Sequence, residues 1–133
     1  MKKGYHGNIE KLTLENDNFR QVLYTGEHLQ LVLMTLQPNE EIGLEVHEDT
    51  DQFFRFEAGD GKVVIDESEY RVGDGDSIIV PAGSRHNVIN TSVTESLKLY
   101  TIYTPPHHKD GMVRATCAEA VADDPEFEGV TTE

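Results

Sequence analysis

Four side chains with nitrogen or oxygen donors occupy positions from which they could meet. Glu45 and His47 are two residues apart, so on a β-strand both leave the same face and can converge on one point. Gln52 begins the next expected strand after a short acidic turn, and His86 begins another after a proline-glycine turn. Two imidazoles, one carboxylate and one amide oxygen suit Mn, Fe, Ni or Zn better than Ca²⁺.

The elements that must position these side chains are short strands. Between residues 19 and 105, β-type runs are broken by turn residues at intervals too short for helices. The expected strands are 20–24, 28–36, 42–47, 52–57, 62–65, 77–80, 86–90 and 97–104. Turns are expected between some of them, at 37–39, 58–61, 72–76 and 81–83. This pattern predicts an all-β sandwich or barrel.

The two ends of the chain have a different character. A capping box at 116–119 and the alanine-rich residues up to 122 predict one short helix outside the barrel. The acidic, turn-rich residues after it are expected to form a frayed tail without chemistry. The segment 9–14 is expected to add to the sheet edge of a second copy, which favours a homodimer.

Five spaced residues carry a family resemblance. Every fixed position of the second motif of the cupin superfamily is matched, by Gly75, Pro81, Gly83, His86 and Asn90. That motif is Gly, five residues, Pro, any residue, Gly, two residues, His, three residues, Asn. The wider sequence from 28 to 112 is similar to small single-domain cupins of the mannose-6-phosphate isomerase-like type.

The first cupin motif is matched only in part. The family has Gly, His, His, Glu and Gly at its fixed positions, and this chain has, in the same order, Asn39, Glu45, His47, Gln52 and Gly59. Asn tolerates the left-handed conformation that Gly supplies, so the first turn is expected to survive. Glu45 brings a carboxylate where the family has imidazole, and Gln52 brings an amide where the family has carboxylate. The formal charge of the site is therefore conserved.

The resemblance implies a double-stranded β-helix, or jelly-roll, cupin barrel with a short C-terminal helix. The expected organisation is an N-terminal arm and first strands over 1–27, the barrel over 28–112, and the helix and acidic tail over 113–133. It also implies one divalent transition metal held by Glu45, His47, Gln52 and His86. Asp51 competes with Gln52, but only Gln52 leaves six residues before the motif's last glycine. The alternative is a metal-free polar network of the same side chains.

The function implied by the resemblance is a metal-dependent enzyme that isomerises, or otherwise transforms, a small hydroxy-carbonyl or sugar-like compound. Glu45, or a histidine after the last strand such as His107 or its neighbour His108, would move the proton. The alternatives are a non-catalytic cupin that binds or senses a small ligand and an iron-dependent dioxygenase-type cupin. An ionisable group beside the metal, but not bound to it, would favour catalysis.

Strand alternation also predicts the lining of the pocket. Phe54 and Phe56 share the inward face with Gln52, whereas Arg55 and Arg85 point away. No guanidinium is therefore expected to meet a phosphate group, which weighs against a sugar-phosphate substrate. The inward face of strand 97–104, which contains Lys98, Tyr100 and Tyr103, cannot be assigned because both faces carry apolar or aromatic residues.

Composition limits the partners. The 133 residues have the size of one domain, and a formal charge of −14 repels nucleic acids and anionic membrane surfaces. The single cysteine, Cys117, excludes an internal disulfide and a finger-type zinc site. The first residues lack the apolar stretch of a signal peptide, so the expected location is the cytoplasm and the expected partner is a small molecule.

Overall fold

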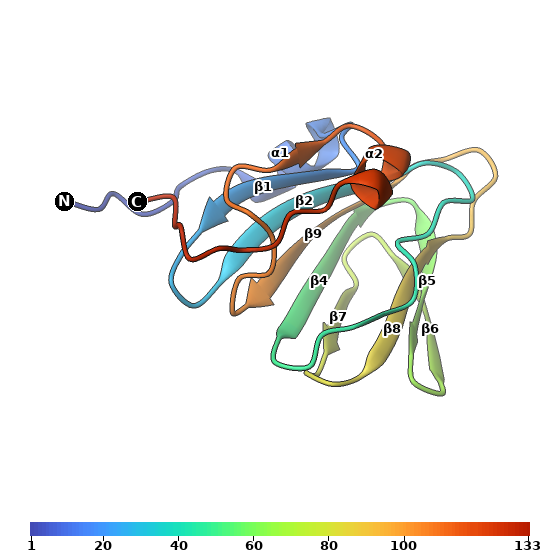
Figure 1. Cartoon of the computed structure of the whole chain (residues 1–133). Coiled ribbons are helices and arrows are strands. Elements are labelled where there is room, and N and C mark those ends of the chain that lie inside the picture. The colour runs from blue at the N-terminus through green and yellow to red at the C-terminus, as the bar shows by residue number, and fades with distance from the viewer.

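Two antiparallel sheets face each other in the computed structural model, which describes residues 1–133 (Figure 1). The six-stranded sheet has the order β10-β1-β2-β9-β4-β7, with β10 at Val113–Arg114, β1 at Arg20–Thr25, β2 at Gln30–Leu36, β9 at Leu97–Thr104, β4 at Asp51–Ala58 and β7 at Ser77–Val80. The four-stranded sheet has the order β3-β8-β5-β6, with β3 at Glu45–Val46, β8 at Arg85–Asn90, β5 at Asp60–Ile65 and β6 at Ser68–Gly73. The predicted all-β architecture is confirmed.

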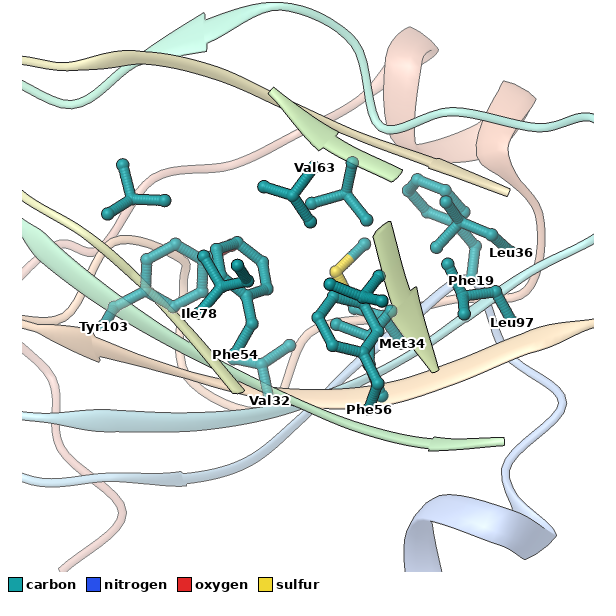
Figure 2. Close-up of a cluster of buried hydrophobic side chains, with 14 of the residues drawn as sticks. Phe19, Val32, Met34, Leu36, Phe54, Phe56, Val63, Ile78, Leu97 and Tyr103 are labelled. Atoms are coloured by element: carbon teal, nitrogen blue, oxygen red, sulfur yellow. The ribbon is translucent and has the colours of Figure 1, made fainter. Parts of the chain in front are cut away.

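The inward faces of the central strands change character along their length. At one end, Gln30 and Gln52 are both Cα partners of Tyr103, and all three side chains are buried. At the other end, Leu36 is the partner of Leu97, and both side chains are fully buried. Figure 2 shows Tyr103 at one end of the core cluster and Leu36 and Leu97 at the other. The same three strands therefore build a polar end and a packed end.

The packed end is closed by two residues of the cupin motifs. The buried amide nitrogen of Asn90 donates to the carbonyls of Leu36, at 3.1 Å, and Glu95, at 2.9 Å. Gly59 has a φ of 95°, and a Cβ at this position would lie 2.4 Å from the carbonyl oxygen of Ser96. Both motif residues thus serve the backbone geometry of the barrel.

Some strands differ from their predicted extent. Strand β3 has only two residues, although 42–47 was the expected range, and β6 was not expected. Four of the six residues of β6 are exposed, so the sequence there lacks the alternation of apolar residues that marks a half-buried strand. Asn39 has a φ of 65°, which confirms its left-handed conformation.

The segment 9–14 is helical, so its predicted role as an edge strand was wrong. Helix α1, Ile9–Glu15, begins at Asn8, whose side chain accepts a hydrogen bond from the Lys11 amide. Thr13 and Asn16 are buried on the side that packs against the six-stranded sheet. The cap and the helical spacing were the signals for a helix. No helix of the chain combines the length and the apolar character that crossing a membrane requires.

The C-terminal residues form the predicted helix but not the predicted frayed tail. Helix α2, Cys117–Ala122, is capped by Thr116, whose hydroxyl accepts from the Glu119 amide at 3.1 Å. Beyond it the chain returns along the barrel, because the Phe127 amide donates to the His107 carbonyl and the Thr132 amide to the Thr25 carbonyl. The ends of the chain lie side by side (Figure 1), where the Lys3 amide donates to the Glu133 carboxylate at 2.6 Å.

Candidate metal centre

Three of the four expected ligands lie together at the polar end. One donor atom each from Glu45, His47 and His86 falls within a cluster whose atoms are at most 4.8 Å apart. Glu45 and His86 are Cα partners in the β3–β8 pair, and His47 directly follows β3. The His47 Nε2 atom lies 3.0 Å from Glu45 Oε2, and the rings of His47 and His86 are 5.2 Å apart.

The surroundings of His86 leave one of its nitrogens free. Its Nδ1 lies 3.1 Å from the Ser84 carbonyl, which can only accept, so Nδ1 carries the hydrogen and Nε2 keeps its lone pair. Burial lowers the pKa of His86, although the hydrogen bond to Ser84 opposes this effect. A neutral imidazole with one oriented N–H is the form that ligates metals.

Glu45 is the anionic member of the cluster. Burial opposes its ionisation, but the hydrogen bond from His47 and the nearby positive charge of Arg20 outweigh that effect and lower the pKa of Glu45. The carboxylate is therefore charged at neutral pH, as a metal ligand must be.

The side-chain oxygen of Gln52 is buried and accepts no hydrogen bond from the chain. The side chain is 3% exposed, and its amide nitrogen donates to Thr101 Oγ1 at 3.0 Å. Its Oε1 atom has no hydrogen-bond partner in the chain, and Gln52 lines the same small pocket as Glu45 and His86. An orphaned buried acceptor is costly, so its position beside the cluster fits a fourth oxygen ligand. The competing Asp51 lies on the surface, where it accepts from the Ala82 amide.

His107 lies against this cluster. Its ring is 4.3 Å from the ring of His47 and stacks on Tyr103 at 5.5 Å. Burial, with the neighbouring His108 and His47, lowers the pKa of His107 to about 4. Its amide donates to the buried Gln30 side chain, which anchors this segment to β2. The ring is thus neutral and fixed beside the predicted ligands without belonging to them.

A buried hydrogen-bond network, which residue spacing did not predict, connects the barrel to the C-terminal segment. Tyr103 Oη lies 3.1 Å from His108 Nε2, and His108 Nδ1 lies 3.2 Å from Asp124 Oδ1. Burial raises the pKa of Tyr103 and lowers that of His108. Burial also opposes ionisation of Asp124, but the bond to His108 and the charge of Arg20 lower its pKa. Asp124 therefore accepts from His108, which accepts from Tyr103.

One guanidinium does lie inside the barrel, contrary to the expectation from the sequence. Arg20 is 3% exposed, and its Cα partner on β2 is the fully buried Met34. Partners in an antiparallel pair share a face, so Arg20 points inward. It lines a cavity of about 140 Å³ together with Glu45 and Asp124. The burial of a charged first residue on β1 could not be read from the alternation of that strand alone.

The other cations lie outside this region. Arg85 is exposed, and Arg55 forms an ion pair with Glu57 at 2.9 Å. Lys98 extends to Asp17, at 3.2 Å, beside helix α1. Arg55 and Arg85 therefore point away from the ligand cluster, as predicted.

Comparisons with known proteins identify the family of the chain. The family model described as "Cupin domain" matches residues 32–103. The chain is 49% identical over 121 residues to the uncharacterized protein YrkC of Bacillus subtilis, a match that covers 86% of this chain and 64% of that protein. It is 41% identical over 112 residues to an uncharacterized protein of Acanthamoeba polyphaga mimivirus, covering 82% of this chain and 70% of that protein. The chain thus spans about two thirds of these relatives.

A solved structure has the same fold along nearly the whole chain. The crystal structure of BH2720 from Bacillus halodurans superimposes with a TM-score of 0.89 at 44% sequence identity. The match covers 91% of this chain and 96% of that one. The double-stranded β-helix barrel with its short C-terminal helix is therefore confirmed, and the chain belongs to the cupin family.

Proposed function

We propose that Glu45, His47, Gln52 and His86 hold one divalent transition metal, which is Mn, Fe, Ni or Zn. The support is the chemistry of the donors: a charged carboxylate, two imidazoles and a buried amide oxygen without another partner, all at one end of the barrel. When bound, such an ion supplies a Lewis acid that polarises a carbonyl group.

We further infer that the chain is an enzyme that isomerises, or otherwise transforms by proton transfer, a small hydroxy-carbonyl or sugar-like compound. This is the chemistry of the mannose-6-phosphate isomerase-like type that the sequence resembles. The observation that carries the inference is His107, a half-buried neutral imidazole whose ring lies 4.3 Å from the ring of His47. A purely binding cupin has no need of an ionisable group in this position.

Different residues of the chain serve as metal ligands, as the proton-transfer group and as the walls of the pocket. Glu45 is charged and in direct contact with His47, so it serves as a ligand, and proton transfer falls to His107. Tyr103 stacks on His107 and donates its hydroxyl hydrogen to His108, which fixes the orientation of the His107 ring from one side. Phe54, 6.4 Å from the ring of His86, supplies an apolar wall.

The test is exchange of substrate hydrogens with solvent. Metal-loaded protein is incubated in D₂O with a panel of small carbonyl compounds, namely dihydroxyacetone, mannose, fructose and pyruvate, and deuterium incorporation next to the carbonyl of each is followed by NMR. We expect turnover, and we expect His107→Gln to slow it by about 100-fold or more while metal content stays the same. His28→Gln, at an exposed histidine, is the matched control.

Other outcomes would contradict the enzymatic proposal. Tight binding of one of these sugars without exchange or turnover would favour the binding or sensing alternative. Consumption of O₂ with an iron-loaded protein would favour the dioxygenase-type alternative.

We also propose that the protein acts as a homodimer in the cytoplasm on a small molecule. The support for a dimer is a row of apolar residues in register across the outer face of the six-stranded sheet, namely Leu31, Ile102, Phe53 and Ile79. Ile79, at the end of this row, is 66% exposed. Light scattering tests the proposal: a dimer mass is expected for the wild type, and a monomer mass at all concentrations would contradict it.

A further inference from the structure

A second cavity adjoins the candidate metal centre. It has a volume of about 140 Å³ and lies between the barrel and helix α2. Its apolar lining includes Phe19, Ile42 and Ala120, and its charged lining consists of Arg20, Glu45 and Asp124. Glu45 also belongs to the ligand cluster, so the cavity and the candidate metal centre share one side chain.

The guanidinium of Arg20 has donor groups in this cavity that lack an acceptor. Its only hydrogen bond runs from Nη1 to Asp124 Oδ1 at 3.5 Å, and its buried Nε has no partner in the chain. Arg114 offers a contrast, since its Nε donates to the Asp123 carbonyl at 2.8 Å and its Nη2 to the Asp123 carboxylate at 3.1 Å. A guanidinium that is 3% exposed and makes one long hydrogen bond is prepared for a further acceptor.

The charges around the cavity indicate what that acceptor carries. Arg20 places one guanidinium in the lining, and Glu45 and Asp124 place one carboxylate each there, so the side chains bring one positive and two negative charges. A divalent ion at the ligand cluster changes this net negative charge to a net positive one. A monoanionic ligand would then leave the region neutral.

We propose that Arg20 binds the carboxylate of the substrate, which is a small 2-hydroxy or 2-oxo acid. This inference rests on the proposed function, since the hydroxyl or carbonyl next to the carboxylate is the part that faces the metal centre. The contact with Asp124 already places one carboxylate on this guanidinium. A phosphate dianion fits less well, because Arg20 is the only cation in the lining and the cavity has room for only a few carbon atoms.

The experiment compares lactate with lactamide, which has the same shape but no charge. Each is titrated by calorimetry into the metal-loaded full chain. Lactate is expected to bind at least about tenfold more tightly than lactamide, and Arg20→Met is expected to lose that preference. Asp124→Asn is expected to bind lactate several-fold more tightly, because it removes the competing carboxylate. Arg71→Met, at an exposed arginine outside this cavity, is the matched control and is expected to behave as the wild type.

The outcomes separate this inference from the proposed function. Equal affinity for lactate in the wild type and a folded Arg20→Met variant, or no gain in Asp124→Asn, would overturn it. If Arg20→Met does not fold, Asp124→Asn and the preference for lactate over lactamide still decide. Tighter binding of inorganic phosphate than of lactate would overturn the assignment to carboxylates. Absence of metal after loading would remove the proposed function, while charge-selective binding that depends on Arg20 would still uphold the anion site.

Discussion

The two ends of the barrel are built from the same strands, but one end buries hydrocarbon side chains and the other buries polar side chains. At the packed end, Met34 and Phe56 are both Cα partners of Leu99, and all three side chains are fully buried. At the polar end, the equivalent inward positions hold Gln30, Tyr103 and Gln52, with one buried oxygen left unpartnered.

The difference shows how the barrel separates stability from chemistry. Buried hydrocarbon at the packed end stabilises the fold, whereas buried polar groups at the other end are tolerated because they form a network. Local mismatches such as an orphaned acceptor are expected at functional sites. Substitutions at the two ends should therefore affect different measurements.

The largest expected effect is at the polar end. Replacing a ligand removes a metal bond outright, so His86→Ala is expected to weaken metal binding by more than about 100-fold. Arg85→Ala, at the exposed neighbouring residue, should bind metal as the wild type does. Competition with a chelator of known affinity measures both variants. Equal affinity in the two would show that His86 is not a ligand.

The packed end should give the opposite result. Leu99→Ala leaves a cavity in the core and is expected to lower the free energy of unfolding by about 2–5 kcal/mol, without a change in metal affinity of the folded protein. Urea unfolding of the metal-free chain measures the loss, with Val93→Ala, at an exposed loop residue, as the control. A parallel loss of metal affinity in Leu99→Ala would mean that the ends are not independent.

A double substitution sharpens the comparison within the polar end. Gln52→Met with Thr101→Val removes both members of a buried hydrogen bond together with the orphaned oxygen. We expect metal affinity to fall about tenfold, while the stability of the metal-free chain changes by less than about 1 kcal/mol. Calorimetric metal titration and urea unfolding provide the two values. A large loss of stability with unchanged affinity would make Gln52 a structural residue.

The smallest expected effect concerns Asp124. Its pKa in the folded chain is lowered, so the charged carboxylate stabilises the fold above its ordinary pKa of 3.8, and this contribution disappears as the pH falls through the lower folded value. Because Asp124 is partly exposed, Asp124→Asn is expected to cost only about 1 kcal/mol at neutral pH.

The pH dependence of that cost is the informative part. The difference between wild type and Asp124→Asn should shrink as the pH falls below 3.8, as measured by urea unfolding at each pH. Asp123→Asn, at the exposed neighbour, should cost less than about 0.5 kcal/mol. A difference that does not change with pH would show that the charge of Asp124 contributes nothing.

The sequence predicted the parts of the site that depend on local spacing. Glu45 lies on β3 and His47 directly follows it, while motif spacing predicts the turns before Gln52 and His86. The two-residue spacing and these turns were enough to predict that the four side chains gather at one end. The core positions Phe54 and Phe56 followed from the same alternation.

The sequence could not predict contacts made across the whole chain. Arg20 and Asp124 are 104 residues apart and meet because β1 and the C-terminal segment lie on the same side of the barrel. The chain from Tyr103 through His108 to Asp124 is likewise set by the path of that segment. Nothing in the spacing of these residues marks them as neighbours, because tertiary packing alone brings them together.

Metal content shows whether Glu45, His47, Gln52 and His86 form a metal site. Elemental analysis is carried out on untagged wild-type protein after incubation with Mn, Fe, Ni and Zn and removal of free metal, beside the Gln52→Ala, His86→Ala double variant. We expect close to one equivalent of one of these metals per wild-type chain and none in the variant. No retained metal in the wild type, or equal retention in both proteins, would contradict it.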